Sequence, residues 1–111
     1  MAKCKLIALT TPVAGREDEF HDWYQNTHLP EILALPGGVS AQRFKLVAKM
    51  IGNDTNPWLA IYDFECDDPM VTLGAMGEAA GSGKLTQSTA SDMATTYTAF
   101  FMEHGPEVKA G

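Results

Sequence analysis

The chain has 111 residues, of which 45% are hydrophobic and 20% charged, and its formal net charge is −6. This length and composition predict one globular domain over 1–111, with a C-terminal tail over 103–111, and exclude a disordered chain. No cluster of Lys and Arg is present to neutralise phosphates, so neither nucleic acid nor an anionic membrane is an expected partner. No 18-residue apolar run and no signal-peptide core occur, so we expect a cytoplasmic protein.

Strand-like and helix-like segments alternate along the chain. Predicted strands cover 3–10, 39–49, 58–66 and 94–103, and predicted helices cover 16–35 and 69–80. Pro30 lacks an N–H donor, so the first helix is expected to kink or restart there. Asp67 or Asp68 can cap the second helix. The segment 84–93 is expected to be weakly helical and to form a mobile lid.

The resulting order, βαββαβ, predicts an α+β fold of the ferredoxin-like type. Four antiparallel strands then form one sheet with both helices on the same face. The predicted strands after the first helix are apolar on both sides, which leaves the other face of the sheet in need of a partner. Burial of roughly 800 Å² per subunit would favour association, so we expect a dimer packed sheet against sheet. The partner is a second copy or a paralogue.

Two features of the chain have simple structural interpretations. Cys4 and Cys66 lie in different predicted strands without metal-ligand spacing, so we interpret them as buried reduced thiols. The run Gly81-Ser82-Gly83-Lys84 looks like part of a phosphate-binding loop, but Leu85 follows the lysine where Ser or Thr is required. We therefore interpret it as a hinge.

His28 is the most informative residue of the chain. It lies on the apolar side of the first predicted helix, four residues after Tyr24, on a stripe that includes Phe20 and Trp23. An imidazole on such a stripe is either hydrogen-bonded packing or a reactive group. No second His or Cys stands at metal-ligand spacing, so no metal is expected. An ordinary pKa near 6.5 suits His28 for general acid/base catalysis.

The first half of the chain resembles the dimeric α/β-barrel superfamily and, within it, small EthD-like proteins. The matching residues are Glu19-Phe20, Trp23-Tyr24, His28-Leu29-Pro30-Glu31, Leu35-Pro36-Gly37-Gly38-Val39 and Arg43 to Leu46. The resemblance implies a pocket between sheet and helices into which His28 projects. In the methylmuconolactone methylisomerase of this superfamily, the corresponding histidine transfers protons. The second catalytic histidine and the strand-two tyrosine of that enzyme have no clear counterpart here.

Further candidate site residues lie on the first helix. Tyr24 can donate its phenol to a substrate oxygen or simply pack, and we pair it with His28 as a catalytic candidate. Trp23 is a pocket wall or part of the core. His21 is expected on the helix flank, in solvent.

The strands supply the remaining candidates for substrate binding. Ser40 opens the second predicted strand close to the helix that carries His28. Arg43, on the other face of that strand, holds either a substrate carboxylate or an ion pair at the dimer interface or surface. Tyr62 and Asp63 point to opposite faces, so at most one of them belongs to the pocket. Tyr97 is a candidate pocket hydroxyl.

Three functions follow as hypotheses. The first is a cofactor-free isomerase or lyase that moves a proton on a small unsaturated organic acid, such as a product of aromatic ring cleavage. The second is a cofactor-free monooxygenase of a phenolic substrate. The third is a non-catalytic protein that binds a small molecule, with haem binding as a variant. The first is the favoured prediction, because a single imidazole suits proton abstraction beside a carbonyl group.

Overall fold

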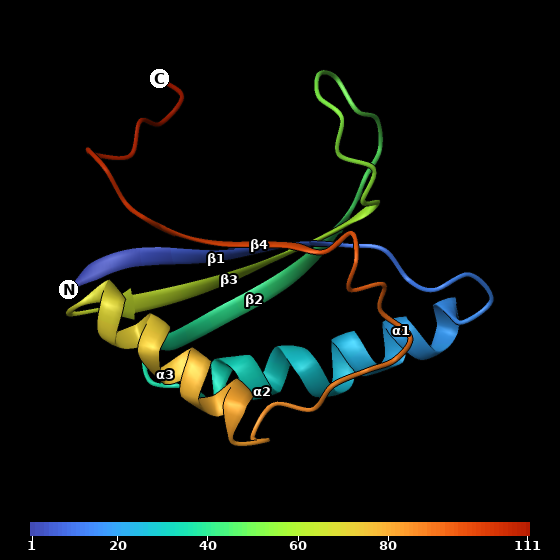
Figure 1. Cartoon of the computed structure of the whole chain (residues 1–111). Coiled ribbons are helices and arrows are strands. Elements are labelled where there is room, and N and C mark those ends of the chain that lie inside the picture. Colours follow the sequence, from blue (N-terminus) through green and yellow to red (C-terminus); the bar gives the residue numbers. More distant parts are fainter.

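Four antiparallel strands form one sheet in the order β2-β3-β1-β4. Figure 1 shows the computed structural model, which describes residues 1–111, with every helix on one side of this sheet. The strands are β1 (Ala2–Thr10), β2 (Gly38–Lys45), β3 (Trp58–Cys66) and β4 (Tyr97–Met102). The predicted ferredoxin-like fold is confirmed. The predicted strand bounds at 49 and 94 are wrong, because 46–49 and 94–96 lie outside the strands, although the Leu46 N–H still donates to the Pro57 carbonyl at 2.8 Å.

The first helical region is interrupted just before Pro30. It consists of α1 (Glu17–Trp23), a π-helical turn η1 (Tyr24–His28) and α2 (Leu29–Leu33). The N–H of Leu29 donates to the carbonyl of Tyr24, five residues earlier, which widens the turn. Pro30 has no N–H for the usual bond to the carbonyl four residues before it, and its ring crowds that carbonyl. The predicted interruption at this proline is confirmed, as a widened turn immediately ahead of it.

Two glycines allow α2 to end against the sheet. Gly37 has a φ of +90°, and a Cβ there would lie 2.4 Å from the carbonyl oxygen of Glu65. A Cβ on Gly38 would lie 2.3 Å from the carbonyl oxygen of Leu33. Only glycine fits both positions. This close approach fixes how α2 joins β2, and so how the helix carrying His28 sits on the sheet.

The core lies between the sheet and α1–η1–α2. Its largest fully buried side chains are Tyr62, Phe20, Phe64, Cys4 and Cys66. Both cysteines are free and buried, as predicted. The opposite face of the sheet is open and keeps large apolar groups in solvent. Phe44, Tyr97 and Phe101 are 41%, 48% and 53% exposed on it. The loop 46–57 and the C-terminal tail also extend on this open side (Figure 1).

The second helix and the segment after it differ from the prediction in one respect. Helix α3 (Pro69–Gly81) begins where expected, and the carboxylate of its N-cap Asp68 accepts from the N–H of Met70. The prediction of weak helix over 84–93 is wrong. This stretch is part of an irregular segment, 82–96, that we call the strap. No helix of the chain has the length and apolar character needed to cross a bilayer.

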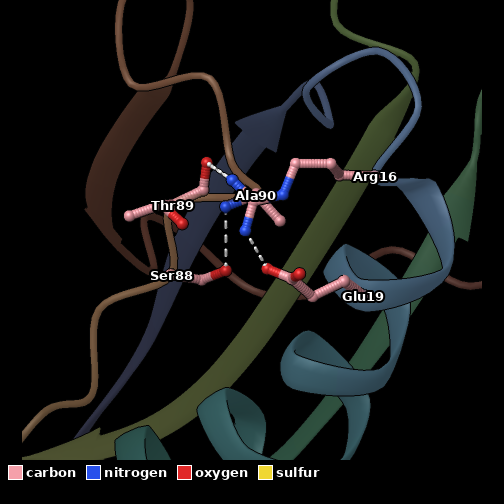
Figure 2. A network of polar contacts seen from close by, with 5 residues as sticks. All are labelled: Arg16, Glu19, Ser88, Thr89 and Ala90. Atoms are coloured by element: carbon pink, nitrogen blue, oxygen red, sulfur yellow. Dashed lines mark hydrogen bonds and ion pairs between the residues drawn. The ribbon is translucent and has the colours of Figure 1, made fainter.

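Contacts from both ends of the α1–α2 region fasten the strap. The Arg16 guanidinium is ion-paired with Glu19 and donates to the carbonyl of Thr89 at 3.0 Å (Figure 2). At the other end, the Glu31 carboxylate accepts from the N–H of Thr86 at 2.9 Å and from its hydroxyl at 2.6 Å. Leu85 and Ala90 of the strap are buried in the core. The strap therefore covers part of the core with Leu85 and Ala90, where the sequence predicts a weak helix.

Candidate functional site

His28 ends the π-helical turn with its ring enclosed by aromatic side chains. It stacks on Trp23 at 4.4 Å between ring centroids, with 20° between the ring planes. Tyr24 meets it edge-on at 5.1 Å, and Tyr62 from β3 lies perpendicular to it at 6.3 Å. The histidine therefore turns toward the sheet, as its place on the apolar stripe predicts. The structure brings four of the predicted site residues, Trp23, Tyr24, His28 and Tyr62, into one cluster.

Unpaired polar atoms distinguish this aromatic cluster from ordinary core packing. The buried side-chain nitrogen and oxygen atoms without a hydrogen-bond partner are Trp23 Nε1, His28 Nδ1 and Tyr62 Oη. Leaving such an atom unpaired costs about 1–3 kcal/mol. All three belong to the same cluster, which offers an indole N–H donor, a phenol hydroxyl and an imidazole nitrogen. Each of these atoms could bind a polar group of a ligand.

Burial determines the protonation state of His28. Desolvation lowers the pKa of its imidazole from 6.5 to about 4, an effect that the Glu31 carboxylate partly offsets. The ring is therefore neutral at neutral pH, which is the form that accepts a proton. Burial also raises the pKa of Tyr24 and of Tyr62, so both hydroxyls stay protonated and able to donate. The site combines one neutral base with two phenolic donors.

Arg43 is a further polar residue on the side of the sheet that the helices cover. It lies on the helix-facing side of β2, paired in register with Ala60. Its Cζ atom lies 4.9 Å from the ring centroid of Tyr24 and 5.2 Å from that of Trp58. The guanidinium donates to His21 Nδ1 at 2.8 Å. Arg43 forms no ion pair within the chain, and the alternative of a pair at a dimer interface stays a prediction.

His21 is only partly exposed, whereas the sequence predicts a solvated side chain on the helix flank. Its ring packs edge-on against Trp58, with 4.4 Å between centroids, and against Phe20 at 5.2 Å. Burial and the neighbouring Arg43 charge lower its pKa, against the opposing effect of Asp18 and Glu17. Helical spacing could not place it there, because its neighbours come from β2 and β3. The strand register supplies these contacts.

Two predicted site residues lie away from His28. Ser40 pairs in register with Asp63 and donates to the Asp63 carboxylate at 3.3 Å, on the open face of the sheet. Tyr97 pairs with Leu9 on that same face. The expectation that Ser40 lies beside the pocket is therefore wrong. Of the pair Tyr62 and Asp63, only Tyr62 faces the helices, in keeping with the predicted alternation.

The two cavities described in the isolated chain lie away from His28. A cavity of about 570 Å³ lies on the open face, between the ends of the strands and the C-terminal tail. A second, of about 250 Å³, lies beside Trp58 and the loop 46–57. Neither is lined by His28. The pocket around His28 that the family resemblance implies is therefore not one of these two cavities. No group of three His, Cys, Asp or Glu side chains is placed to hold a metal ion.

Two solved structures share this fold. One is an "ethyl tert-butyl ether d (EthD) family protein" from Bacillus halodurans C-125, with a TM-score of 0.61 and 24% identity over 97% of this chain and 100% of the other. The second, from Shewanella loihica PV-4, is described as "a putative monooxygenase", with a TM-score of 0.59 and 15% identity over 96% of this chain and 99% of the other. No protein-family model and no curated protein sequence matches the chain. At these identities the likeness establishes the fold, which agrees with the EthD-like resemblance of the sequence.

Proposed function

We propose that this chain is a cofactor-independent enzyme that moves a proton on a small unsaturated organic acid, as an isomerase or lyase. His28 is the general acid/base and Tyr24 assists it. The observation that carries the proposal is the buried neutral imidazole whose Nδ1 atom has no partner. Acids of the kind released by cleavage of aromatic rings suit it, because their conjugation stabilises the enolate that proton removal creates.

The reaction begins with transfer of a proton from a carbon beside a carbonyl group to the His28 imidazole. The C–H electron pair moves into the carbonyl and forms an enolate. The phenol of Tyr24 or Tyr62 donates a hydrogen bond to the enolate oxygen, and Trp23 Nε1 is a further donor. An imidazolium with a lowered pKa is a strong acid, so it readily returns the proton to another carbon. A positioned acid/base group accelerates such a step by roughly 10²- to 10⁴-fold.

We expect substrate entry to involve movement, because neither described cavity reaches His28. The strap is the segment that we expect to move, and only at one end. Glu31, which binds Thr86, lies one helical turn after His28, whereas backbone hydrogen bonds from Val13 to Ala90 and from Asp92 to Thr11 hold the other end. Release of Thr86 from the Glu31 carboxylate frees the strap at the end nearest the aromatic cluster. The lid predicted for 84–93 thus stays a proposal, with an irregular segment in place of the predicted helix.

We also propose that the open face of the sheet receives a second copy of the chain. Phe44, Tyr97 and Phe101 are exposed on it, and Met50 and Ile51 in the adjacent loop are 95% and 96% exposed. Covering this surface would bury about 800 Å² per subunit, the size of a stable interface. Sedimentation at micromolar concentration should give a dimer that Phe101→Glu dissociates. A monomeric wild type would contradict the proposal.

Deuterium exchange tests the proton transfer. Unsaturated acids and lactone acids are incubated with the protein in heavy water, and NMR follows deuterium incorporation beside the carbonyl group. His28→Gln should lower the exchange rate at least about 10²-fold, and Tyr24→Phe should lower it less. The fold of each variant is checked by circular dichroism. Equal exchange in wild type and His28→Gln would refute the role of His28, and bound but unchanged acids would indicate a binding protein.

A cofactor-free monooxygenase of a phenolic substrate is the second candidate function. The Shewanella protein that shares the fold is described as "a putative monooxygenase", and aromatic rings surround His28 here. An oxygen electrode separates the two functions. Oxygen uptake with phenols, abolished in His28→Gln, would favour the monooxygenase, whereas the isomerase or lyase consumes none.

A further inference from the structure

Arg43 is an unpaired cation in a chain rich in carboxylates. The sequence holds 14 Asp and Glu against 8 Lys and Arg, and its two arginines are Arg16 and Arg43. Arg16 is ion-paired with Glu19, whereas Arg43 has no acidic partner. Partial burial makes this costly, and it lowers the pKa of the guanidinium. A half-buried arginine without a carboxylate partner is poised to accept one from outside.

The neighbours of Arg43 hold its guanidinium in a defined orientation. Rings of Tyr24, Trp58 and Phe20 lie 4.9, 5.2 and 5.6 Å from its Cζ atom. A planar cation over aromatic faces keeps its N–H groups at the rim of its plane. One N–H group donates to His21 Nδ1 at 2.8 Å. The remaining donors are free for a bidentate contact with a carboxylate.

We propose that Arg43, held in place by His21 and the aromatic rings around it, binds the carboxylate of a small organic acid. Arg43 contacts the ligand, and His21 is a positioning residue that acts through Arg43. Lys45 adds a second positive charge, with its Nζ atom 6.0 Å from the Trp58 centroid. This inference deepens the proposed function, on which it rests for the substrate being an acid.

Tyr24 links this carboxylate site to His28. Its ring centroid lies 4.9 Å from Arg43 Cζ and 5.1 Å from the His28 centroid. The carboxylate site is therefore adjacent to the base but shares no polar atom with it. Binding at Arg43 can consequently be measured on a chain whose His28 is replaced, and a failure of the catalytic proposal leaves this test intact.

Two-dimensional ¹H–¹⁵N NMR of the arginine Nε–H groups tests the proposal with benzoate as the probe. The Arg43 signal should shift in a saturable manner, in the wild type and in His28→Gln alike. The Arg16 signal is the internal control and should stay in place, because Glu19 already occupies Arg16. Benzamide, the neutral analogue, should shift neither signal. No saturable shift of the Arg43 signal would overturn the proposal, and an equal response to inorganic phosphate would overturn its specificity for carboxylates.

Variants at two positions separate ligand binding from packing. Arg43→Lys keeps the charge but loses the bidentate geometry, so benzoate should bind about tenfold more weakly, as followed by tryptophan fluorescence. His21→Phe keeps a ring against Trp58 but removes the acceptor, and should weaken binding by about three- to tenfold. His21→Asn restores an acceptor oxygen and should recover most of the affinity. Wild-type affinity in both His21→Phe and Arg43→Lys would show that the cluster is only structural.

Discussion

Replacement of His28 by Gln should remove a defined part of the pH dependence of folding. Burial holds the pKa of His28 at about 4 in the folded chain, against 6.5 for an ordinary imidazole. Between these two pH values the unfolded chain binds a proton that the folded chain does not, so protonation favours unfolding. The stability that depends on a neutral His28 is complete above about pH 6.5 and is lost as the pH falls toward 4.

The size of this effect follows from the pKa shift. One pKa unit corresponds to about 1.4 kcal/mol, so the change from 6.5 to about 4 sets an upper limit of about 3 kcal/mol. Between pH 7.5 and pH 4.5 the wild type should lose roughly 2–3 kcal/mol more unfolding free energy than His28→Gln does. The carboxylates titrate in both chains, so their contribution cancels in the difference.

Urea unfolding followed by circular dichroism at the two pH values measures the difference. His104→Gln is the matched control, because His104 lies in the exposed tail, and this variant should follow the wild type. If His28→Gln loses as much unfolding free energy as the wild type, the His28 ring is solvated in the folded chain. That result would refute the closed aromatic cluster and, with it, the proposed catalytic site.

Four further variants concern the cluster, the α2–β2 junction, helix α3 and the strap. Tyr62→Phe removes a buried hydroxyl without a partner, so unfolding free energy should rise by about 1 kcal/mol while deuterium exchange on substrate slows. Gly37→Ala should destabilise the fold by more than about 2 kcal/mol in urea unfolding, because its φ is +90° and a Cβ would meet a β3 carbonyl. Gly77→Ala, in open space on α3, should instead stabilise it by up to about 1 kcal/mol. Glu31→Gln weakens a charge-assisted bond, so the Thr86 amide should exchange its hydrogen about tenfold faster by NMR; unchanged exchange would contradict the fastening role.

The element order could be predicted from the sequence because each element carries its own local signal. The strand 58–66 alternates, Asp68 and Pro69 begin a helix, and Pro36-Gly37-Gly38 ends one. Strand ends are harder to predict, since residues 46–49 include three apolar side chains, yet only Leu46 still makes a backbone hydrogen bond to the segment before β3. The strap was harder still. Its burial depends on Leu85 and Ala90 meeting a core that is assembled from the rest of the chain.

The faces of β2 show where periodicity alone misleads. Phe44 and Leu46 alternate with charged residues, which suggests that their side of the strand packs on the helices. In the structure Arg43 takes the helix side and Phe44 the open side. Aromatic rings stabilise the inward arginine, and the open face accepts the apolar ring. An amphipathic pattern cannot identify which face is covered when both faces of a sheet carry apolar groups.

The π-helical turn explains a contact in the site that regular helical spacing does not predict. In a regular α-helix, residues five apart lie well apart around the axis, so Trp23 and His28 would not stack. The π-helical turn has more residues per turn and brings these two rings to 4.4 Å. Pro30 favours that turn by removing one N–H donor directly after it. The same short run of sequence therefore interrupts the helix, stacks the imidazole on an indole and desolvates it, and these three effects together leave a neutral, unpaired base facing the sheet.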